Sequence, residues 1–316
     1  MKHYSLIAPA KINLYLEIIG DRPDGYHELA MVMQSIDLAD QIDIVSNGSP
    51  IVRVRCDNSD VPTDNTNLAY RAAELMVKNF PDVYGKLGGV DITIHKRIPI
   101  SAGLAGGSTN AAAVLVGVDL LWNLGLTQSE IEQLGSQLGS DVPFCVAGGT
   151  AIATGRGEQL SALLGLNNIY IVLGKYRSLS VSTPWAYKTY RQQFGNTYIK
   201  DKHSLAARAA AVHSAPMVQA ILHKNTIEIS QKLHNDLEKV VLPEYPLVSQ
   251  LRETFASFEG VLGTMMSGSG PSVFAICDSV ERANQVKDGV REIIPNEDLD
   301  LFVAQMISHG IHVKPM

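Results

Sequence analysis

IPISAGLAGGSTNAAAVL, residues 98–115, decides the fold, because it joins a strand-like stretch to a helix-like one through glycines. Residues 91–98 alternate between polar and apolar, which predicts a strand, and residues 110–123 are small and apolar, which predicts a buried core helix. Gly103, Gly106 and Gly107 allow close backbone approach, and Ser108 and Thr109 are expected to cap the helix. Unpaired first-turn N–H groups favour an anion such as phosphate.

This loop is not one of the common nucleotide-binding fingerprints. No Gly-Lys-Ser/Thr follows, so it is not a Walker A loop, and its glycine spacing is not that of a dinucleotide-binding fold. A tight turn that binds nothing would need the same glycines. Other segments must therefore decide between the two interpretations.

The first predicted strand, residues 11–18, carries polar residues on one face. Lys11 and Asn13 alternate with apolar residues and lie roughly 6.6 Å apart along a strand. They form either a solvated face or a pair that holds a reacting hydroxyl. The turn RPDG at 22–25 is followed by Tyr26 and His27, which are either structural or able to stack on a base and bond to its edge.

Asp141 has two possible roles. It precedes Val142 and Pro143, so it can cap a helix, and it can also accept or orient the proton of a substrate hydroxyl in phosphoryl transfer. Caps are also expected at Asp64 or Asn65 for a helix over 66–80, and at Thr127 with Glu130 for a helix that ends at Leu138. MSGSGPSVFAI, at 266–276, is either a simple β-turn or a second loop that closes over the first.

The bulk properties describe a cytoplasmic protein of two domains. We expect domains at 1–160 and 161–316 from a length of 316 residues. A net charge of −6 disfavours nucleic acid. We expect neither a signal nor a transit peptide at the N-terminus, and we expect the apolar stretch 111–126 to be a core helix rather than a membrane span. Three distant cysteines without a CxxC pair indicate reduced thiols. No pattern in the sequence specifies an oligomeric state.

Three ordered segments resemble the motifs of the GHMP kinase family: PAKINLYLEI (9–18), PISAGLAGGSTNAA (99–112) and SGSGPSVFAI (267–276). The resemblance implies an α+β fold of two domains with the active site in the cleft between them. It also implies an ATP-dependent kinase acting on an alcohol, with Mg²⁺ delivered by ATP and no metal site built from protein residues alone.

Further segments are similar to those members that act in the non-mevalonate route to isoprenoid precursors. They are RPDGYHEL (22–29), DNTNLAYRAA (64–73), HKRIP (95–99), LGSDVPF (138–144), VSTPWAY (181–187) and HNDLE (234–238). Those members phosphorylate the 2-hydroxyl of a methylerythritol linked to cytidine diphosphate. The resemblance therefore implies a small cytidine-diphosphate-linked polyol as the partner molecule.

The resemblance also assigns roles to individual residues. Lys11 and Asp141 would be catalytic, and the substrate would contact Asn13, Tyr26, His27, Asp141, Thr183 and Tyr187. ATP would contact Asn67, Lys96, Pro99, Gly103, Leu104, Ala105, Gly106, Gly107, Ser108, Thr109, Asn110 and Ser267. The chain departs from the commonest form of the motif at Ala105 and Thr109, where glycine and serine are usual, and has Tyr187 where phenylalanine is frequent.

Three alternatives stay open at this point. Another GHMP kinase would act on homoserine or a mevalonate derivative, but a carboxylate substrate would favour Arg or Lys in place of the Tyr26–His27 segment. A silent relative would bind ligand without turnover, although both Lys11 and Asp141 are present. A plain α/β binding module would use its glycine loop only to turn the chain.

Overall fold

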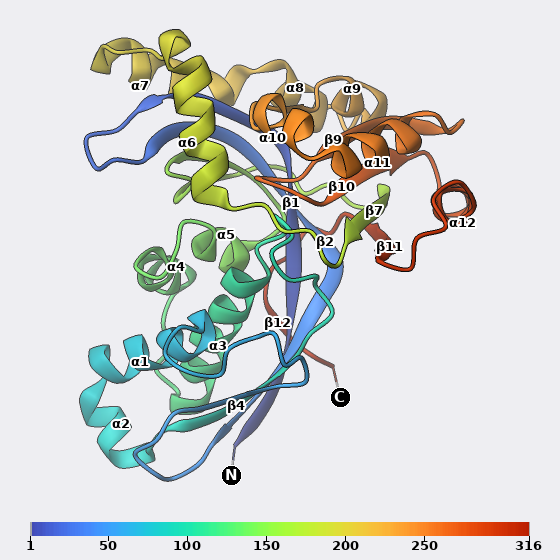
Figure 1. Ribbon diagram of the computed structural model, residues 1–316. Coiled ribbons are helices and arrows are strands. Elements are labelled where there is room, and N and C mark those ends of the chain that lie inside the picture. Colours follow the sequence, from blue (N-terminus) through green and yellow to red (C-terminus); the bar gives the residue numbers. More distant parts are fainter. Residues whose placement is uncertain (1, 316) are drawn as a thin grey trace.

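The computed structural model describes residues 2–315, which form two β-sheets with helices packed on both (Figure 1). The strands are β1 (His3–Asp21), β2 (His27–Ser46), β3 (Arg53–Cys56), β4 (Val90–His95), β5 (Thr150–Gly155), β6 (Gln159–Ala162), β7 (Tyr170–Tyr176), β8 (His234–Asn235), β9 (Val261–Met266), β10 (Val273–Cys277), β11 (Leu299–Gln305) and β12 (His312–Val313). The helices are α1 (Leu68–Asn79), α2 (Pro81–Leu87), α3 (Gly106–Trp122), α4 (Gln128–Ser136), α5 (Val142–Ala147), α6 (Thr183–Phe194), α7 (Lys202–Ala211), α8 (Pro216–Leu222), α9 (Thr226–Gln231), α10 (Glu238–Glu244), α11 (Pro246–Ala256) and α12 (Val280–Ile293), with 3₁₀ turns η1 (Gly195–Thr197) and η2 (Val212–Ser214). The predicted α+β class is confirmed.

The larger sheet is built around the long antiparallel pair β1 and β2. Its main order is β12-β1-β2-β4-β3, while β5 joins β2, β6 joins β5 and β8 joins β1. Most of these strands come from the first half of the chain. However, β8 and β12 lie beyond residue 160 and still pair with β1. The division into 1–160 and 161–316 stays a prediction.

A bulge in β1 changes the expected pattern of the first strand. The pairing with β2 shifts between Asn13 and Tyr15, so one extra residue is inserted there. As a result Ile12 and Leu14 pack in one core cluster and Leu16 packs in another. A single apolar face over 11–18 was therefore a wrong prediction, and the bulge turns Leu16 toward the side of Lys11 and Asn13.

Helices α1, α3 and α5 cover one face of the larger sheet. Apolar residues of α1 and α3, such as Ala72 and Leu115, pack against Ile42 and Ile92 of the sheet. The cap of α1 is Asn67, whose Oδ1 accepts from Ala69 N at 2.8 Å, so the predicted caps at Asp64 or Asn65 came too early. The Thr127–Glu130 capping box of α4 is confirmed, but the helix ends at Ser136.

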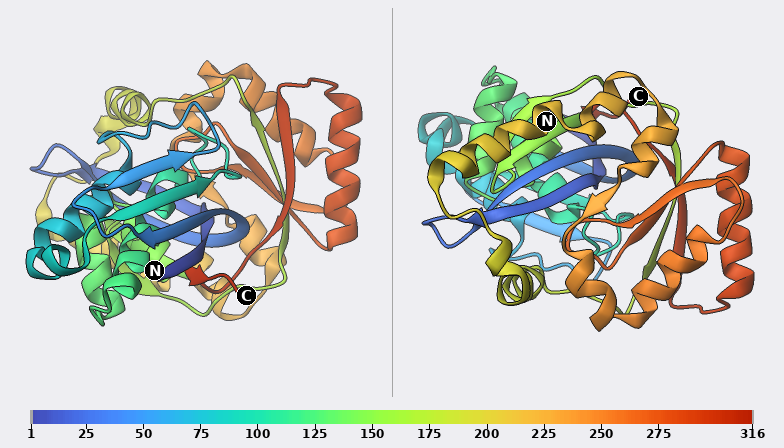
Figure 2. Two further views of the ribbon diagram at one scale, coloured as in Figure 1. Left: turned by 90° about the horizontal axis from the view of Figure 1, so that it is seen from below. Right: turned by 90° about the horizontal axis from the view of Figure 1, so that it is seen from above.

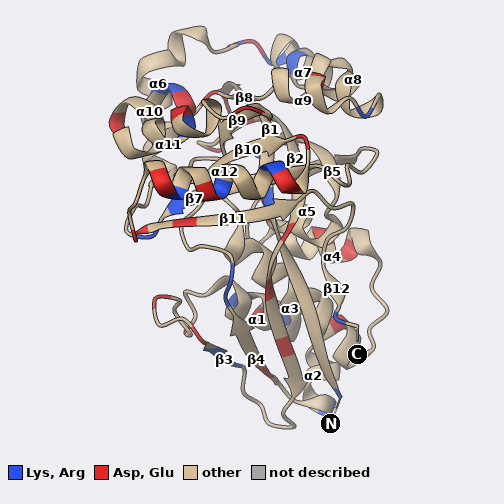
Figure 3. Cartoon of the chain, turned by 90° about the vertical axis from the view of Figure 1, so that its right-hand side faces the viewer, with Lys and Arg blue, Asp and Glu red and all other residues tan. Residues whose placement is uncertain are grey.

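The smaller sheet, ordered β11-β7-β10-β9, has apolar side chains on both faces. Val172 and Val273 face the cluster that contains residues of α11 and α12, while Ile171 and Phe274 face the cluster that contains residues of α8 and α9. In Figure 2, α12 lies along the outside of this sheet. Acidic and basic residues, coloured red and blue in Figure 3, follow the length of α12, whereas its buried positions are apolar.

Helix α3 is buried along most of its length, as its composition predicted. Residues 202–222 form α7, η2 and α8, and Pro216 begins α8. Within residues 2–315, the structure contains no helix with the length and apolar character needed to cross a bilayer.

Candidate active site

A pocket of about 630 Å³ lies where β1, the β1–β2 turn, the glycine loop, the start of α6 and the β9–β10 turn meet. It gathers residues that are far apart in the sequence. The predicted site residues that line it are Lys11, Asn13, Tyr26, His27, Gly103, Ala105, Gly106, Gly107, Ser108, Asp141, Thr183 and Tyr187.

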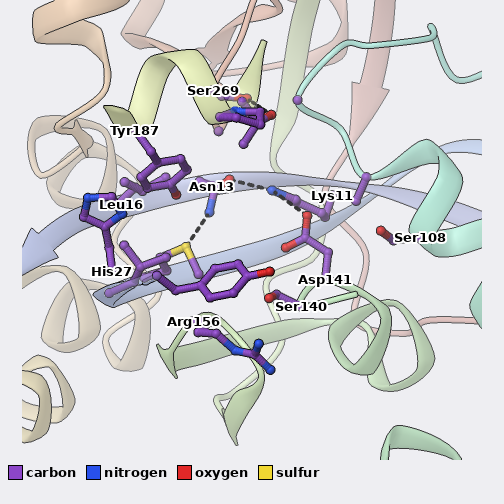
Figure 4. A pocket seen from close by; sticks show the side chains of 18 of the residues that line it. Lys11, Asn13, Leu16, His27, Ser108, Ser140, Asp141, Arg156, Tyr187 and Ser269 are labelled. Atoms are coloured by element: carbon purple, nitrogen blue, oxygen red, sulfur yellow. Dashed lines mark hydrogen bonds and ion pairs between the residues drawn. The ribbon is translucent and has the colours of Figure 1, made fainter. Parts of the chain in front are cut away.

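Lys11 and Asp141 face each other inside this pocket (Figure 4). Lys11 Nζ lies 3.7 Å from Asp141 Oδ2 and donates a hydrogen bond of 2.7 Å to Asn13 Oδ1. Lys11 is 5% exposed and Asn13 is fully buried, so the solvated-face interpretation of this strand is wrong. Among the described residues, the buried ammonium of Lys11 has a single carboxylate, that of Asp141, beside it. It can therefore attract a second negative charge while it still pairs with Asp141.

Asp141 stands at the cap position of α5 without acting as a cap. Its backbone is helical (φ −82°, ψ −14°), and its carboxylate makes no capping hydrogen bond. The interpretation of Asp141 as only a helix cap is therefore wrong. The side chain is instead half-buried and directed toward Lys11, with Ser108 and Ser140 near it in the pocket (Figure 4).

The glycine loop presents the N-terminus of α3 to the pocket. Thr109 N makes the first intrahelical bond, to Ala105 O at 2.9 Å, so the N–H groups of Gly106, Gly107 and Ser108 come before it. Ala105 takes the cap position in the left-handed region, with φ 57°, and provides no side-chain cap. The predicted capping by Ser108 or Thr109 is wrong, because both residues lie inside the first turn.

The β9–β10 turn packs directly on the glycine loop. Ser267 Oγ donates to Gly103 O at 3.1 Å, and a Cβ added to Gly103 would come within 2.3 Å of Ser267 O. Asn235 holds the turn from behind, since its Nδ2 donates to Met266 O and Gly268 O, each at 2.8 Å. The sequence motif at 266–276 therefore does close over the first loop.

Aromatic side chains line the other end of the pocket. The rings of His27 and Tyr187 lie 5.1 Å apart with an interplanar angle of 32°, and Arg156 lies over the ring of Tyr26 at 4.9 Å. Burial, helped by the positive charge of Arg191, lowers the pKa of His27 to about 4 despite the nearby Asp21. Burial, with the charge of Asp141, raises the pKa of Tyr187 well above its usual value.

Other predicted site residues do not line this pocket: Asn67, Lys96, Pro99, Leu104, Thr109, Asn110 and Ser267. Two of them meet at Asp40, which is fully buried and which the sequence did not indicate. Asp40 Oδ2 pairs with Lys96 Nζ and accepts from Asn110 Nδ2 at 2.8 Å. Its Oδ1 accepts from the backbone N–H groups of Arg97 at 2.7 Å and Ile98 at 2.9 Å.

Pocket residues that sequence reasoning missed include Ser140, Arg156, Lys188 and Arg191. Ser269 Oγ is 2.7 Å from Thr183 Oγ1, which joins the β9–β10 turn to α6. Ser140 and Lys188 are direct neighbours of the predicted Asp141 and Tyr187, so proximity in sequence was a usable signal for them. Arg156 and Arg191 carried no local signal.

Comparison with known proteins identifies the family of this chain. Residues 67–149 match the GHMP kinases N terminal domain and residues 217–296 match the GHMP kinases C terminal domain. The chain belongs to the GHMP kinase family.

Within that family, the relatives with high sequence identity over almost the whole chain share one name. It is 72% identical to the 4-diphosphocytidyl-2-C-methyl-D-erythritol kinase of Nostoc punctiforme, over 99% of each chain, and 56% identical to that of Synechocystis over the same shares. A crystal structure of 4-(cytidine 5'-diphospho)-2C-methyl-D-erythritol kinase matches with a TM-score of 0.74 and 28% identity, covering 96% of this chain and 98% of that one. Homoserine kinase from Cytophaga hutchinsonii, at 19% identity and a TM-score of 0.73, covers 99% of this chain and 98% of its own and shares the fold.

Proposed function

We propose that this chain is an ATP-dependent kinase that phosphorylates the 2-hydroxyl of 4-diphosphocytidyl-2-C-methyl-D-erythritol, giving the 2-phosphate and ADP for isoprenoid precursor synthesis. One observation carries the proposal: a single pocket holds the Lys11–Asp141 pair between the glycine loop and an aromatic cluster. The full-length relatives bearing that enzyme's name support the same choice. We place the enzyme in the cytoplasm, in keeping with its free cysteines.

The glycine loop is the proposed site of the ATP phosphates. The N–H groups of Gly106, Gly107 and Ser108 and the positive end of α3 suit phosphate oxygens. The ammonium of Lys96 lies beside this loop, where a Cβ on Gly106 would be 3.1 Å from its Nζ. Lys96 and Asn110, held by Asp40, are therefore proposed to support the nucleotide from behind the loop.

The Lys11–Asp141 pair is the proposed catalytic centre. As the acceptor oxygen bonds to the γ-phosphorus and the bond to the β-phosphate oxygen breaks, the hydroxyl proton passes to Asp141. Lys11 stabilises the negative charge that develops on the transferred group, and its bond to Asn13 Oδ1 fixes the ammonium. Phosphoryl transfer depends mainly on such positioning and charge, so this small set of groups is sufficient.

Mg²⁺ fits the oxygen donors that this pocket offers. Mg²⁺ usually takes one or two protein oxygens together with phosphates and water, and Ser108 Oγ is the proposed protein donor. When bound, the ion neutralises charge on the phosphates. Lys11 and the α3 N-terminus act on the same charge from the protein side.

The aromatic end is the proposed site of the cytosine. His27 is neutral at physiological pH, so one ring nitrogen donates and the other accepts a hydrogen bond. Its Nε2 is buried and makes no hydrogen bond with the described residues. The rings of Tyr187 and Tyr26 provide apolar surface for a base.

The deciding experiment is an ADP-release assay with Mg-ATP and three alcohols: the cytidyl substrate, homoserine and mevalonate. Turnover with the cytidyl substrate alone is the expected result. Turnover with another alcohol would reject the base-binding assignment, and ATP binding without any turnover would favour a silent relative. Tyr26→Ala should raise KM for the cytidyl substrate more than KM for ATP.

A further inference from the structure

The turn between β1 and β2 carries Tyr26 of the proposed base site on an exposed loop and leads directly into the buried His27 of β2. Residues 23–26 are solvent-exposed, and the turn extends beside α6 in Figure 1. Tyr26 belongs to this turn and His27 begins β2 directly after it, whereas Tyr187 belongs to α6. The separation of His27 from Tyr187 therefore depends on how firmly the turn is attached to α6.

Arg191 makes that attachment with a single guanidinium. Its Nε donates to Asp21 Oδ1 at 2.7 Å, and its Nη2 donates to Gly25 O at 3.1 Å. Asp21 is the last residue of β1 and Gly25 lies in the turn itself. The planar guanidinium holds both acceptors in one geometry. Arg191 also follows Tyr187 by four residues, which places both side chains on one face of α6.

Arg191 also acts on His27 through its charge. The groups that face this imidazole are Asp21 from β1, Arg191 and Tyr187 from α6, and Tyr198. Asp21 Oδ1 is 3.8 Å from His27 Nε2, beyond hydrogen-bond distance, and favours protonation. Arg191 opposes protonation and competes for the same carboxylate oxygen. The Arg191 guanidinium, which binds the turn to α6, therefore also helps to keep the His27 imidazole neutral.

We propose that Arg191 is a positioning residue for the base of the acceptor substrate, because it fastens the β1–β2 turn to α6 and fixes the distance between His27 and Tyr187. The proposal rests on the proposed function and extends it to a residue outside the reacting centre. Arg191 acts through the turn and through His27. It need not touch the reacting hydroxyl.

Arg191→Ala should raise KM for the cytidyl substrate about tenfold while KM for ATP and kcat stay within twofold, as expected for lost substrate binding. Arg191→Lys keeps the charge but not the fork, so KM should stay raised while the pKa of His27, followed by NMR titration, stays low. Asp21→Asn should likewise raise KM without raising that pKa. Arg191→Ala alone should move the pKa of His27 upward.

Arg208→Ala is the matched control. Arg208 forms an equally bidentate pair with Glu17 of β1, at 2.9 Å for each bond, but does not line the pocket. It should change neither KM nor the His27 titration. Equal rises in both KM values, or the same effect from Arg208→Ala, would overturn the proposal. An unchanged His27 titration in Arg191→Ala would also overturn it, whereas absence of wild-type turnover would refute the proposed function instead.

Discussion

Replacement of Asp40 by alanine tests whether one buried carboxylate organises the region behind the phosphate loop. Four donors end on Asp40: the Lys96 ammonium, the Asn110 amide and the backbone N–H groups of Arg97 and Ile98. Asp40 is 0% exposed and the Lys96 side chain is 6% exposed. Asp40→Ala therefore leaves an ammonium and three neutral donors without their acceptor.

The expected loss follows from that count. Removing one partner of a buried ion pair costs about 3–5 kcal/mol, and each abandoned neutral donor about 1–3 kcal/mol before relaxation. The donors share one acceptor and their losses do not add, so we expect about 4 kcal/mol. That is a large part of a typical unfolding free energy of about 5–15 kcal/mol. KM for ATP should rise as well, because Lys96 and Asn110 lose their anchor.

Urea unfolding followed by circular dichroism measures the stability change, with an unchanged slope as the check on two-state behaviour. Asp37→Ala is the control, since Asp37 lies on the same strand but is exposed, and it should cost about 1 kcal/mol or less. The double variant Asp40→Leu/Lys96→Met removes both charges and should recover much of the loss. A loss under about 1 kcal/mol for Asp40→Ala, or no recovery in the double variant, would refute the reasoning.

Three further predictions address the pocket itself. Asp141→Asn should lower kcat by a factor of about 10²–10⁴. The Kd of ATP, measured by calorimetric titration, should stay within twofold of the wild-type value. A near-normal kcat would show that Asp141 is not the proton acceptor. Gly103→Ala puts a Cβ 2.3 Å from Ser267 O at a residue with φ +72°. The variant should therefore be less stable by about 1–3 kcal/mol and have a higher KM for ATP. An unchanged urea unfolding curve would contradict this prediction. The pKa of His27 is about 4 in the folded chain and about 6.5 in the unfolded chain. As pH falls, the unfolded chain therefore binds a proton before the folded chain does. The free energy of unfolding should consequently decrease between pH 6.5 and pH 4. His27→Gln should flatten that decline, and an identical slope in the variant would reject the assignment.

The segments with local signals were predictable from the sequence. The loop at 98–115 shows glycines, a preceding alternation and a small-residue helix, all of which are short-range properties. Lys11 and Asn13 were identified, but their burial was not, because it depends on the β9–β10 turn and α5 covering the strand. The bulge after Asn13 was also invisible, since it is defined by the register with β2.

Long-range contacts set the limit of the sequence analysis. Asp40 lies in an ordinary strand sequence, and its partners are 56–70 residues away. Arg191 meets Asp21 across 170 residues, and no pattern near either residue indicates the pair. For Asp141 the local pattern favoured a cap as well as a base. The lack of a capping hydrogen bond from its carboxylate and the position of Lys11 in space separate the two roles.

The pairing of β12 with β1 has a consequence for the order in which the protein is made. Leu6 and Ile7 pair with Val313 and His312, so one neighbour of the first strand is synthesised after strands β2 to β11. Until then that edge of β1 has open backbone groups, which can pair with strands of other chains. Nascent chains are thus exposed to aggregation through this edge during translation, and slower or cooler expression should reduce the losses.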